Sequence, residues 1–269
     1  MKPHVLILRT AGTNCDKETE FAFKQAGAKT SLEHINRVKK TARLSGYQII
    51  ALPGGFSYGD DLGAGKIFSL EISLWLKDAI KKFIDKGGLM IGICNGFQIM
   101  VKTGLLPDAD FVQKVTLTGN DSGRFEDRWV YLRLEARPAC RQAGTQRPET
   151  QNNKPQNIWL KGLPEVIMLP VAHGEGKFYA SRQILDRIEA GGQAVLKYCD
   201  AQGKDCGYPL NPNGALNAIA GITDASGRIF GLMPHPERFM FKHHSPFWQE
   251  KESEPFGVRI FKNAVEYFK

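Results

Sequence analysis

One cysteine in this sequence stands in a frame that suits a nucleophile. Cys94 lies in the stretch Gly92-Ile93-Cys94-Asn95-Gly96, directly after an apolar run and directly before an amphipathic stretch that begins at Phe97. A sharp strand-to-helix turn flanked by glycines lifts such a side chain out of a sheet, and the N-terminus of the following helix favours the thiolate. We therefore predict Cys94 as a catalytic nucleophile. The same frame is missing around the other four cysteines, Cys15, Cys140, Cys199 and Cys206.

A thiol nucleophile needs a base, and the base needs a group that orients it. The stretch Met233-Pro234-His235-Pro236-Glu237 offers both. Prolines favour extended backbone, so His235 and Glu237 are expected to project to the same side, as on a strand. Because the stretch follows an apolar run, and parallel strands collect active-site residues at their carboxyl ends, we expect it near Cys94. His235 is predicted as the base and Glu237 as its partner.

Two glycine-rich loops also follow apolar runs. The glycines of the first loop, 53–60, would let main-chain N–H groups approach a ligand and stabilise an oxyanion. The second loop, 170–176, is expected to line a pocket. The sequence has no GxxxxGK[ST] pattern, no GxGxxG after a strand and no metal-ligand spacing. We therefore expect no ATP, dinucleotide or metal site in this chain.

The first half of the chain alternates short apolar runs with amphipathic stretches, as in a parallel sheet with crossover helices. This order predicts a doubly wound α/β fold. In the second half, 112–118 and 129–135 alternate like half-exposed strands, which predicts an antiparallel extension of the sheet. Further strands are expected at 5–8, 49–52, 89–93, 166–171, 194–198, 218–222 and 228–233, and helices at 16–25 (capped by Asp16), 67–86, 97–102 and 256–268.

Composition favours one globular domain over residues 1–269, with a polar surface insertion at about 136–157. The net charge of +8 comes from scattered lysines and arginines, which argues against nucleic-acid binding. The positive charge can be explained by a solvated surface or by a face that docks on an acidic partner. The five cysteines show no paired spacing, so a disulfide framework is not expected. The sequence also has no signal-peptide core and no apolar run long enough to span a membrane. We therefore predict a cytoplasmic protein that contacts no membrane.

Six stretches of the sequence resemble the class I glutamine amidotransferases, the Cys-His-Glu family, and within it the glutaminase part of phosphoribosylformylglycinamidine synthase. The strings PGGFSYGD and MPHPER are the most specific of these likenesses. The resemblance implies a flavodoxin-like, mostly parallel sheet. The six stretches are 12–16, 54–65, 92–98, 170–178, 211–214 and 233–238.

The resemblance also implies the chemistry. Cys94, His235 and Glu237 would hydrolyse glutamine through a γ-glutamyl thioester, with the amides of Gly55 and Asn95 as the oxyanion hole. Ammonia would pass to a large synthetase partner, with or without a small accessory subunit. That partner would use ATP and Mg²⁺ in purine biosynthesis, and no cofactor is expected in this chain. The expected substrate-binding residues are Gly54, Gly55, Asn95, Gln98 and His173.

Two other functions stay open. One is a different cysteine hydrolase on the same scaffold, such as a stand-alone peptidase or deglycase, or a different amidotransferase subunit, since a fold and a triad do not fix the substrate. The other is a non-enzymatic regulatory subunit, which the competent residues at all three triad positions make less favoured. The segments 123–126 and 196–198 are similar to the glutaminase end of a long single-chain enzyme, which leaves the partner's architecture open.

Overall fold

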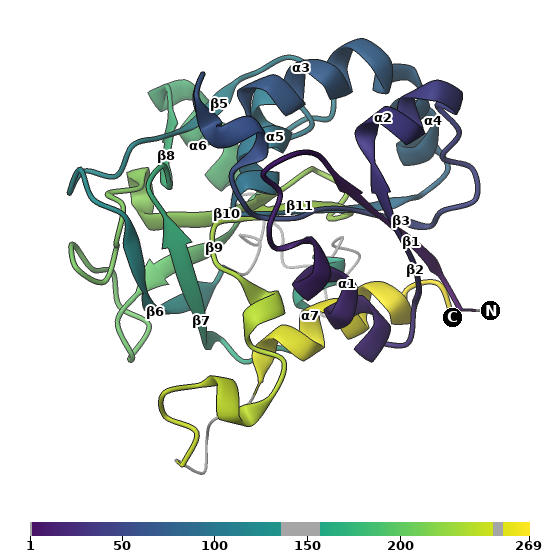
Figure 1. Ribbon diagram of the computed structural model, residues 1–269. Coiled ribbons are helices and arrows are strands. Elements are labelled where there is room, and N and C mark those ends of the chain that lie inside the picture. Colours follow the sequence, from purple (N-terminus) through teal and green to yellow (C-terminus); the bar gives the residue numbers. More distant parts are fainter. Residues whose placement is uncertain (1, 136–156, 250–254) are drawn as a thin grey trace, which may run out of the picture.

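A computed structural model describes residues 2–135, 157–249 and 255–269 (Figure 1). Its centre is a nine-stranded sheet in the order β2-β1-β3-β4-β11-β10-β9-β6-β7. The first five strands in this order pair in parallel, and the other four join them by antiparallel pairing. The parallel strands are β1 (His4–Arg9), β2 (Lys29–His34), β3 (Ile49–Leu52), β4 (Leu89–Ile93) and β11 (Ile229–Leu232), and the antiparallel ones are β6 (Glu126–Leu134), β7 (Val166–His173), β9 (Ala194–Cys199) and β10 (Ile219–Thr223).

The parallel half has the strand order 2-1-3-4 followed by one more strand, which is the flavodoxin-like order. All residues of β3, β4 and β11 are buried, as expected for strands covered on both faces. The predicted fold class, a doubly wound sheet with an antiparallel extension, is confirmed.

Helices cover both faces of the parallel half (Figure 1). On one face α1 packs on α7, and their Phe23 and Phe261 rings meet edge to face with centroids 4.9 Å apart. On the other face α3 packs against α5. The helices are α1 (Asp16–Gln25), α2 (Ile35–Thr41), α3 (Lys66–Trp75), α4 (Lys77–Asp85), α5 (Asn95–Thr103), α6 (Arg182–Ala190) and α7 (Phe256–Glu266).

Three predictions about single elements are wrong. The helix expected over 67–86 is two helices, because Leu76 leaves the helical region with φ −120° and ψ −1° although no glycine or proline marks the break. Asp16 is the first residue of α1 rather than its cap, and Cys15 holds the N-cap position. Of the strand expected at 112–118, only β5 (Val115–Thr118) forms, and it pairs with β8 (Lys177–Ala180) in a separate two-stranded sheet.

Four elements, β2, α2, β8 and α6, were not predicted from the sequence. The sequence of β2 is KTSLEH, and none of its six residues is fully buried because it lies at the edge of the sheet. The polar insertion expected at 136–157 lies outside the described residues except for Asn157. The single domain over 1–269 stays a prediction. Within the described residues, none of the helices combines the length and apolarity that crossing a bilayer requires.

The parallel strands bring their carboxyl ends to one edge of the sheet. β1, β3, β4 and β11 are hydrogen-bonded neighbours, and the loops that follow them carry Cys15, Gly54, Cys94 and His235. Segments more than 200 residues apart in sequence therefore meet at this edge.

Candidate active site

Cys94 sits on a strained turn between β4 and α5. Its φ of 51° and ψ of −108° are unusual for a residue other than glycine, and it occupies the N-cap position of α5. Only glycine fits at the two flanking positions. A Cβ on Gly92 would lie 2.6 Å from the Gly96 oxygen, and a Cβ on Gly96 would lie 1.8 Å from the Leu52 oxygen. The turn therefore has the elbow geometry that the glycine frame indicates.

His235 and Glu237 form a buried hydrogen-bonded pair. Nδ1 of His235 lies 2.6 Å from Oε1 of Glu237, and the two residues are 1% and 3% exposed. The pair does not arise from an extended strand, as the sequence suggested. His235 instead precedes a single 3₁₀ turn, Pro236–Arg238, because Pro236 is well suited to the first position of such a turn. The main-chain N–H of His235 donates to the Pro170 oxygen at 2.8 Å and fixes the entry to that turn.

The charges around His235 favour its protonated form. Burial by itself would lower the pKa of the imidazole, but the Glu237 carboxylate and the sulfur of Cys94 outweigh it and raise the pKa well above its ordinary value. Nε2 of His235 has no hydrogen-bond partner among the described residues. The Cys94 thiol instead faces the Ala172 oxygen at 3.6 Å. Because the Cys94 sulfur also lies close enough to raise the pKa of His235, the arrangement is compatible with proton transfer between the two groups.

Gly54 and Gly55 make room for the site. A Cβ on Gly54 would lie 2.9 Å from Cε1 of His235 and 3.4 Å from Cβ of Cys94, so only glycine fits between them. Gly55 has a φ of +134°, and a Cβ there would lie 2.6 Å from the Asn14 nitrogen. The loop after β3 thus brings main chain against both predicted catalytic side chains.

A second thiol lies beside the same imidazole. The ligand atoms of Cys15, His235 and Glu237 all lie within 4.8 Å of one another. The Cys15 sulfur accepts from Nη2 of Arg238 at 3.2 Å and lies 3.3 Å from Oδ1 of Asn14. Burial raises the pKa of the Cys15 thiol, although His235 and Arg238 oppose this. The motif Gly12-Thr13-Asn14-Cys15-Asp16 was the sequence signal for this thiol.

Cys15, His235 and Glu237 are poorly suited to bind a metal ion together. Nδ1 of His235 is already bonded to Glu237, and the guanidinium of Arg238 brings positive charge to the Cys15 sulfur. Both features favour a proton-transfer site over a cation site at this place.

His173 is held as a neutral imidazole. Its Nδ1 lies 3.2 Å from Oδ1 of Asn120, and its Nε2 lies 3.4 Å from Nδ2 of Asn213. Burial, with a contribution from the positive charge of His235, lowers the pKa of His173 to about 3. Both ring nitrogens are thus engaged within the protein, which gives this side chain a clear part in shaping the loop after β7. Its predicted contact with substrate stays a prediction.

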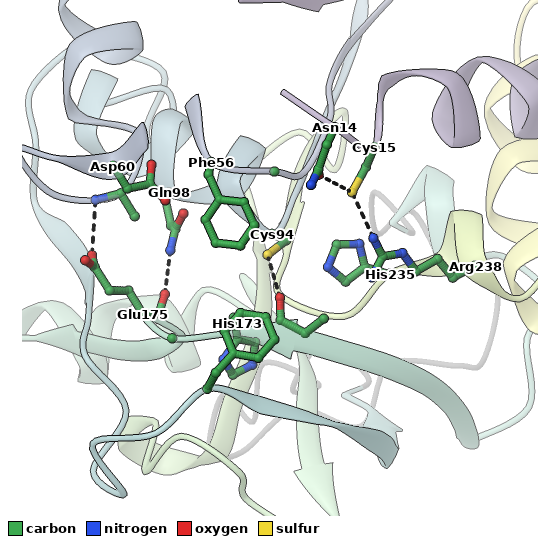
Figure 2. A pocket seen from close by; sticks show the side chains of 15 residues that line it. Asn14, Cys15, Phe56, Asp60, Cys94, Gln98, His173, Glu175, His235 and Arg238 are labelled. Carbon is green, nitrogen blue, oxygen red and sulfur yellow. Dashed lines mark hydrogen bonds between the residues drawn. The ribbon is translucent and has the colours of Figure 1, made fainter. Parts of the chain in front are cut away.

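These residues surround a cavity of about 260 Å³ (Figure 2). Of the residues predicted from sequence, Cys94, His235, Gly55, Gln98 and His173 line it. Gly54, Asn95 and Glu237 are not lining residues: Glu237 and Gly54 contact His235, and Asn95 bonds Gln98. The remaining lining residues stand in stretches that the sequence analysis picked out, 12–16, 53–65, 123–126, 170–178 and 233–238, but they were not predicted individually as site residues: Asn14, Cys15, Phe56, Asp60, Ala64, Phe125, Ala172, Gly174, Glu175 and Arg238.

Hydrogen bonds tie three loops together around the cavity. Nδ2 of Asn95 donates to Oδ1 of Asp60 at 3.2 Å and to Oε1 of Gln98 at 2.9 Å. Nε2 of Gln98 donates to the Glu175 main-chain oxygen at 2.5 Å, and the Ala64 N–H donates to Oε2 of Glu175 at 3.2 Å. The side-chain amide of Gln98 is therefore already engaged, and its predicted contact with substrate is untested.

Known proteins that are similar to this chain are glutamine amidotransferases. Residues 2–268 match the family of CobB/CobQ-like glutamine amidotransferase domains. The chain is 46% identical over 271 residues to a Dehalococcoides mccartyi protein, "Phosphoribosylformylglycinamidine synthase subunit PurQ", covering 99% of this chain and 98% of that one. A Methanococcus maripaludis protein of the same name is 41% identical over 284 residues, covering 99% and 97%. The solved "Structure of PurLQS from Thermotoga maritima" is similar with a TM-score of 0.70 at 32% identity, covering 100% of both chains.

Proposed function

This chain belongs to the CobB/CobQ-like glutamine amidotransferase family, and we propose that it is the glutamine-hydrolysing subunit of a phosphoribosylformylglycinamidine synthase. The observation that carries the proposal is the Cys94 elbow beside the His235–Glu237 pair at one cavity. The full-length similarity to proteins named as this synthase subunit supports it.

The proposed mechanism assigns a role to each group. His235 takes the proton of the Cys94 thiol, and the resulting thiolate attacks the γ-carboxamide carbon of glutamine. The main-chain N–H groups of Gly55 and Asn95 stabilise the oxyanion. His235 delivers its proton to the leaving nitrogen, so that ammonia departs and a γ-glutamyl thioester remains. The imidazole then takes a proton from water, which attacks the thioester and releases glutamate and the Cys94 thiol. Glu237 stabilises the imidazolium throughout.

The ammonia needs a protected route. In bulk water at neutral pH it would be mostly protonated and no longer nucleophilic, so hydrolysis is useful only next to the enzyme that consumes ammonia. We propose a large synthetase partner, with or without a small accessory subunit, as in the assembly named PurLQS. ATP and Mg²⁺ would bind to that partner rather than to this chain, and the complex would work in the cytoplasm.

The test separates the two half-reactions. In the assembled complex, Cys94→Ala should abolish glutamine-dependent formation of formylglycinamidine ribonucleotide and leave synthesis from added ammonium salts intact. Loss of both activities would contradict the division of labour. A wild-type chain that hydrolyses unrelated amides or peptides equally well, with no response to the partner, would favour the other cysteine hydrolases.

A further inference from the structure

A second cavity lies at the opposite edge of the sheet from Cys94. It has a volume of about 380 Å³ and is formed where β3 and β4 begin, by the loop between α2 and β3, by α4 and by the chain after α7. In Figure 1 this is the side of the molecule on which both chain ends are labelled. Cavities of this size bind small molecules in many proteins. The proposed reaction takes place at the carboxyl ends of the strands, so it assigns nothing to this cavity.

Three cationic side chains line the second cavity. Arg43 comes from the loop after α2, whereas Lys82 and Lys86 lie four residues apart at the end of α4. Among the residues that the structure describes, none of the three forms an ion pair. The nearby elements also carry acidic residues, but these do not line the cavity: Asp78, Asp85 and Glu266. The described wall is therefore electropositive.

Other cations of the same two helices have partners. On α2, Nη1 of Arg37 lies 3.3 Å from Oε2 of Glu33. On α4, the ammonium group of Lys81 lies over the Phe111 ring, 5.7 Å from its centroid. The C-terminal end of a helix favours lysine, which explains in part the two lysines of the cavity. It does not explain why an arginine from a different element lines the same cavity.

Aromatic rings form the apolar part of the wall, from Tyr47, Phe83 and Phe268. The Phe83 ring lies directly against Gly88, where a Cβ would be 2.3 Å from it, so the ring can hold this position only beside glycine. The Tyr47 ring packs on the His4 ring, with centroids 4.6 Å apart. Rings that are held in place in this way offer a flat ligand a surface for stacking or edge contacts.

Neutral hydrogen-bond donors add to the three cations. Oε1 of Gln48 accepts from the main-chain N–H of His4 at 2.8 Å, and Nε2 of Gln48 has no partner among the described residues. The Tyr47 hydroxyl also has none within the described part of the chain. Lysine and arginine side chains carry donors and no acceptor. A ligand that completes this cavity must therefore bring acceptors and negative charge.

A phosphate group joined to an aromatic ring meets both requirements. Its oxygens accept charge-assisted hydrogen bonds from arginine and lysine, and arginine matches phosphate geometry with two parallel bonds. The ring would pack on the aromatic part of the wall. An extended nucleic acid fits less well, because the lysines and arginines of this chain are scattered and form no basic stripe.

We propose that this second cavity binds a nucleoside monophosphate. Arg43, Lys82 and Lys86 bind the phosphate group, and the aromatic wall packs on the base. The assignment is independent of the proposed glutaminase function, because the second cavity shares no lining residue with the Cys94 cavity.

The experiment measures binding to the full chain by isothermal titration calorimetry. The probes are AMP and UMP, with adenosine and inorganic phosphate for comparison, at physiological ionic strength, where exposed charges are largely screened. At least one of the two nucleotides should bind with one molecule per chain. Adenosine and phosphate should bind at least about 10-fold more weakly than that nucleotide, because each lacks one of the two interactions.

Substitutions separate the two parts of the cavity. Lys82→Ala should weaken nucleotide binding about 10-fold to 100-fold, as expected for the loss of a hydrogen bond to a charged group, and leave adenosine binding unchanged. Tyr47→Leu should weaken the binding of nucleotide and adenosine alike and leave phosphate binding unchanged, since only the ring contact is lost.

Lys81→Ala is the matched control. It removes the same charge from the same helix, one residue away, but Lys81 does not line the cavity. Lys81→Ala should therefore leave nucleotide affinity as in the wild type. Arg238→Gln, which removes a cation from the Cys94 cavity, should do the same.

Four results would overturn the assignment. Equal losses in Lys81→Ala and Lys82→Ala would show only a general attraction between charges. A loss confined to Arg238→Gln would place the nucleotide in the Cys94 cavity. Tighter binding of a single-stranded oligoadenylate than of AMP would indicate an extended nucleic-acid surface. Absence of saturable binding of both AMP and UMP at millimolar concentration would leave the cavity without the proposed ligand.

Discussion

Two buried thiols lie beside the imidazole of His235, and they differ in backbone and in partners. Cys94 is held at φ 51° at the N-terminus of α5, where its sulfur lies 3.6 Å from the Ala172 oxygen and helps to raise the pKa of His235. Cys15 has an ordinary φ of −93°, and its sulfur is held between Asn14 and Arg238. Burial raises the pKa of Cys15.

The difference shows that closeness to a base does not by itself define a nucleophile. Both thiols line the cavity, but the strained elbow presents Cys94 to it with few competing contacts. Cys15 is engaged by its neighbours and is better suited to keep His235 and Arg238 in position. Four substitutions test this contrast between the two thiols.

The largest effect is expected from exchanging the thiols one at a time. Cys94→Ser should lower kcat/KM for glutamine in the assembled complex on the order of 10⁴-fold or more, because the nucleophile and base act as a unit. Cys15→Ser is the matched variant and should cost less than about 10-fold, since no bond forms to its sulfur. The reverse order of losses would make Cys15 the nucleophile.

Glu237→Gln should follow, with a loss of kcat on the order of 10²-fold to 10⁴-fold, as for other orienting carboxylates. The carboxylate raises the pKa of His235, so its removal lets the imidazole lose its proton at lower pH. The alkaline limb of the pH profile of kcat/KM should therefore move to lower pH. Glu18→Gln, which loses only a surface pair with Arg238, should leave that limb in place. An unmoved limb in Glu237→Gln would mean that His235 does not carry the catalytic proton.

A smaller loss is expected when the space between the thiols is filled. Gly54→Ala places a Cβ 2.9 Å from Cε1 of His235 and 3.2 Å from the Cys15 sulfur, so the imidazole must shift. The resulting misalignment should lower kcat about 10-fold to 100-fold. Gly46→Ala is the control, because its Cβ would meet no atom within 4 Å. Equal kcat values for the two variants would show that the position of His235 is not critical.

The smallest effect concerns the reactivity of Cys15 alone. Arg238 lowers the pKa of this thiol against the larger effect of burial, so Arg238→Gln should shift its alkylation by iodoacetamide to higher pH. Peptide mass spectrometry in a Cys94→Ser background isolates the Cys15 signal. A shift to lower pH would show that the guanidinium does not stabilise the thiolate.

Much of the fold follows from local sequence patterns. The apolar runs 49–52, 89–93 and 229–232 are strands because they are buried on both faces, and such runs are legible without a structure. The polar edge strand β2 and the break at Leu76 could not be predicted from the sequence, because neither carries a local signal. The pairing of β5 with β8 depends on a contact across some 60 residues of sequence, which patterning cannot reveal.

The candidate site also has a part that could be predicted from the sequence and a part that could not. Cys94, His235 and Glu237 are recognisable because each stands in a short motif whose chemistry is local. The contact of Arg238 with Cys15 and the shared wall of Asp60 and Glu175 arise only from folding, across 223 and 115 residues. Their motifs were visible, but only the sheet edge brings the side chains together.

The most direct test of the central claim is to find the sulfur that carries the γ-glutamyl group. The assembled complex is mixed with isotopically labelled glutamine, quenched in acid during turnover and digested, and the thioester-bearing peptide is identified by mass spectrometry. A label on Cys94, lost in Cys94→Ser and retained in Cys15→Ser, is the predicted result. A label on Cys15, or full glutamine hydrolysis by Cys94→Ser, would contradict the account.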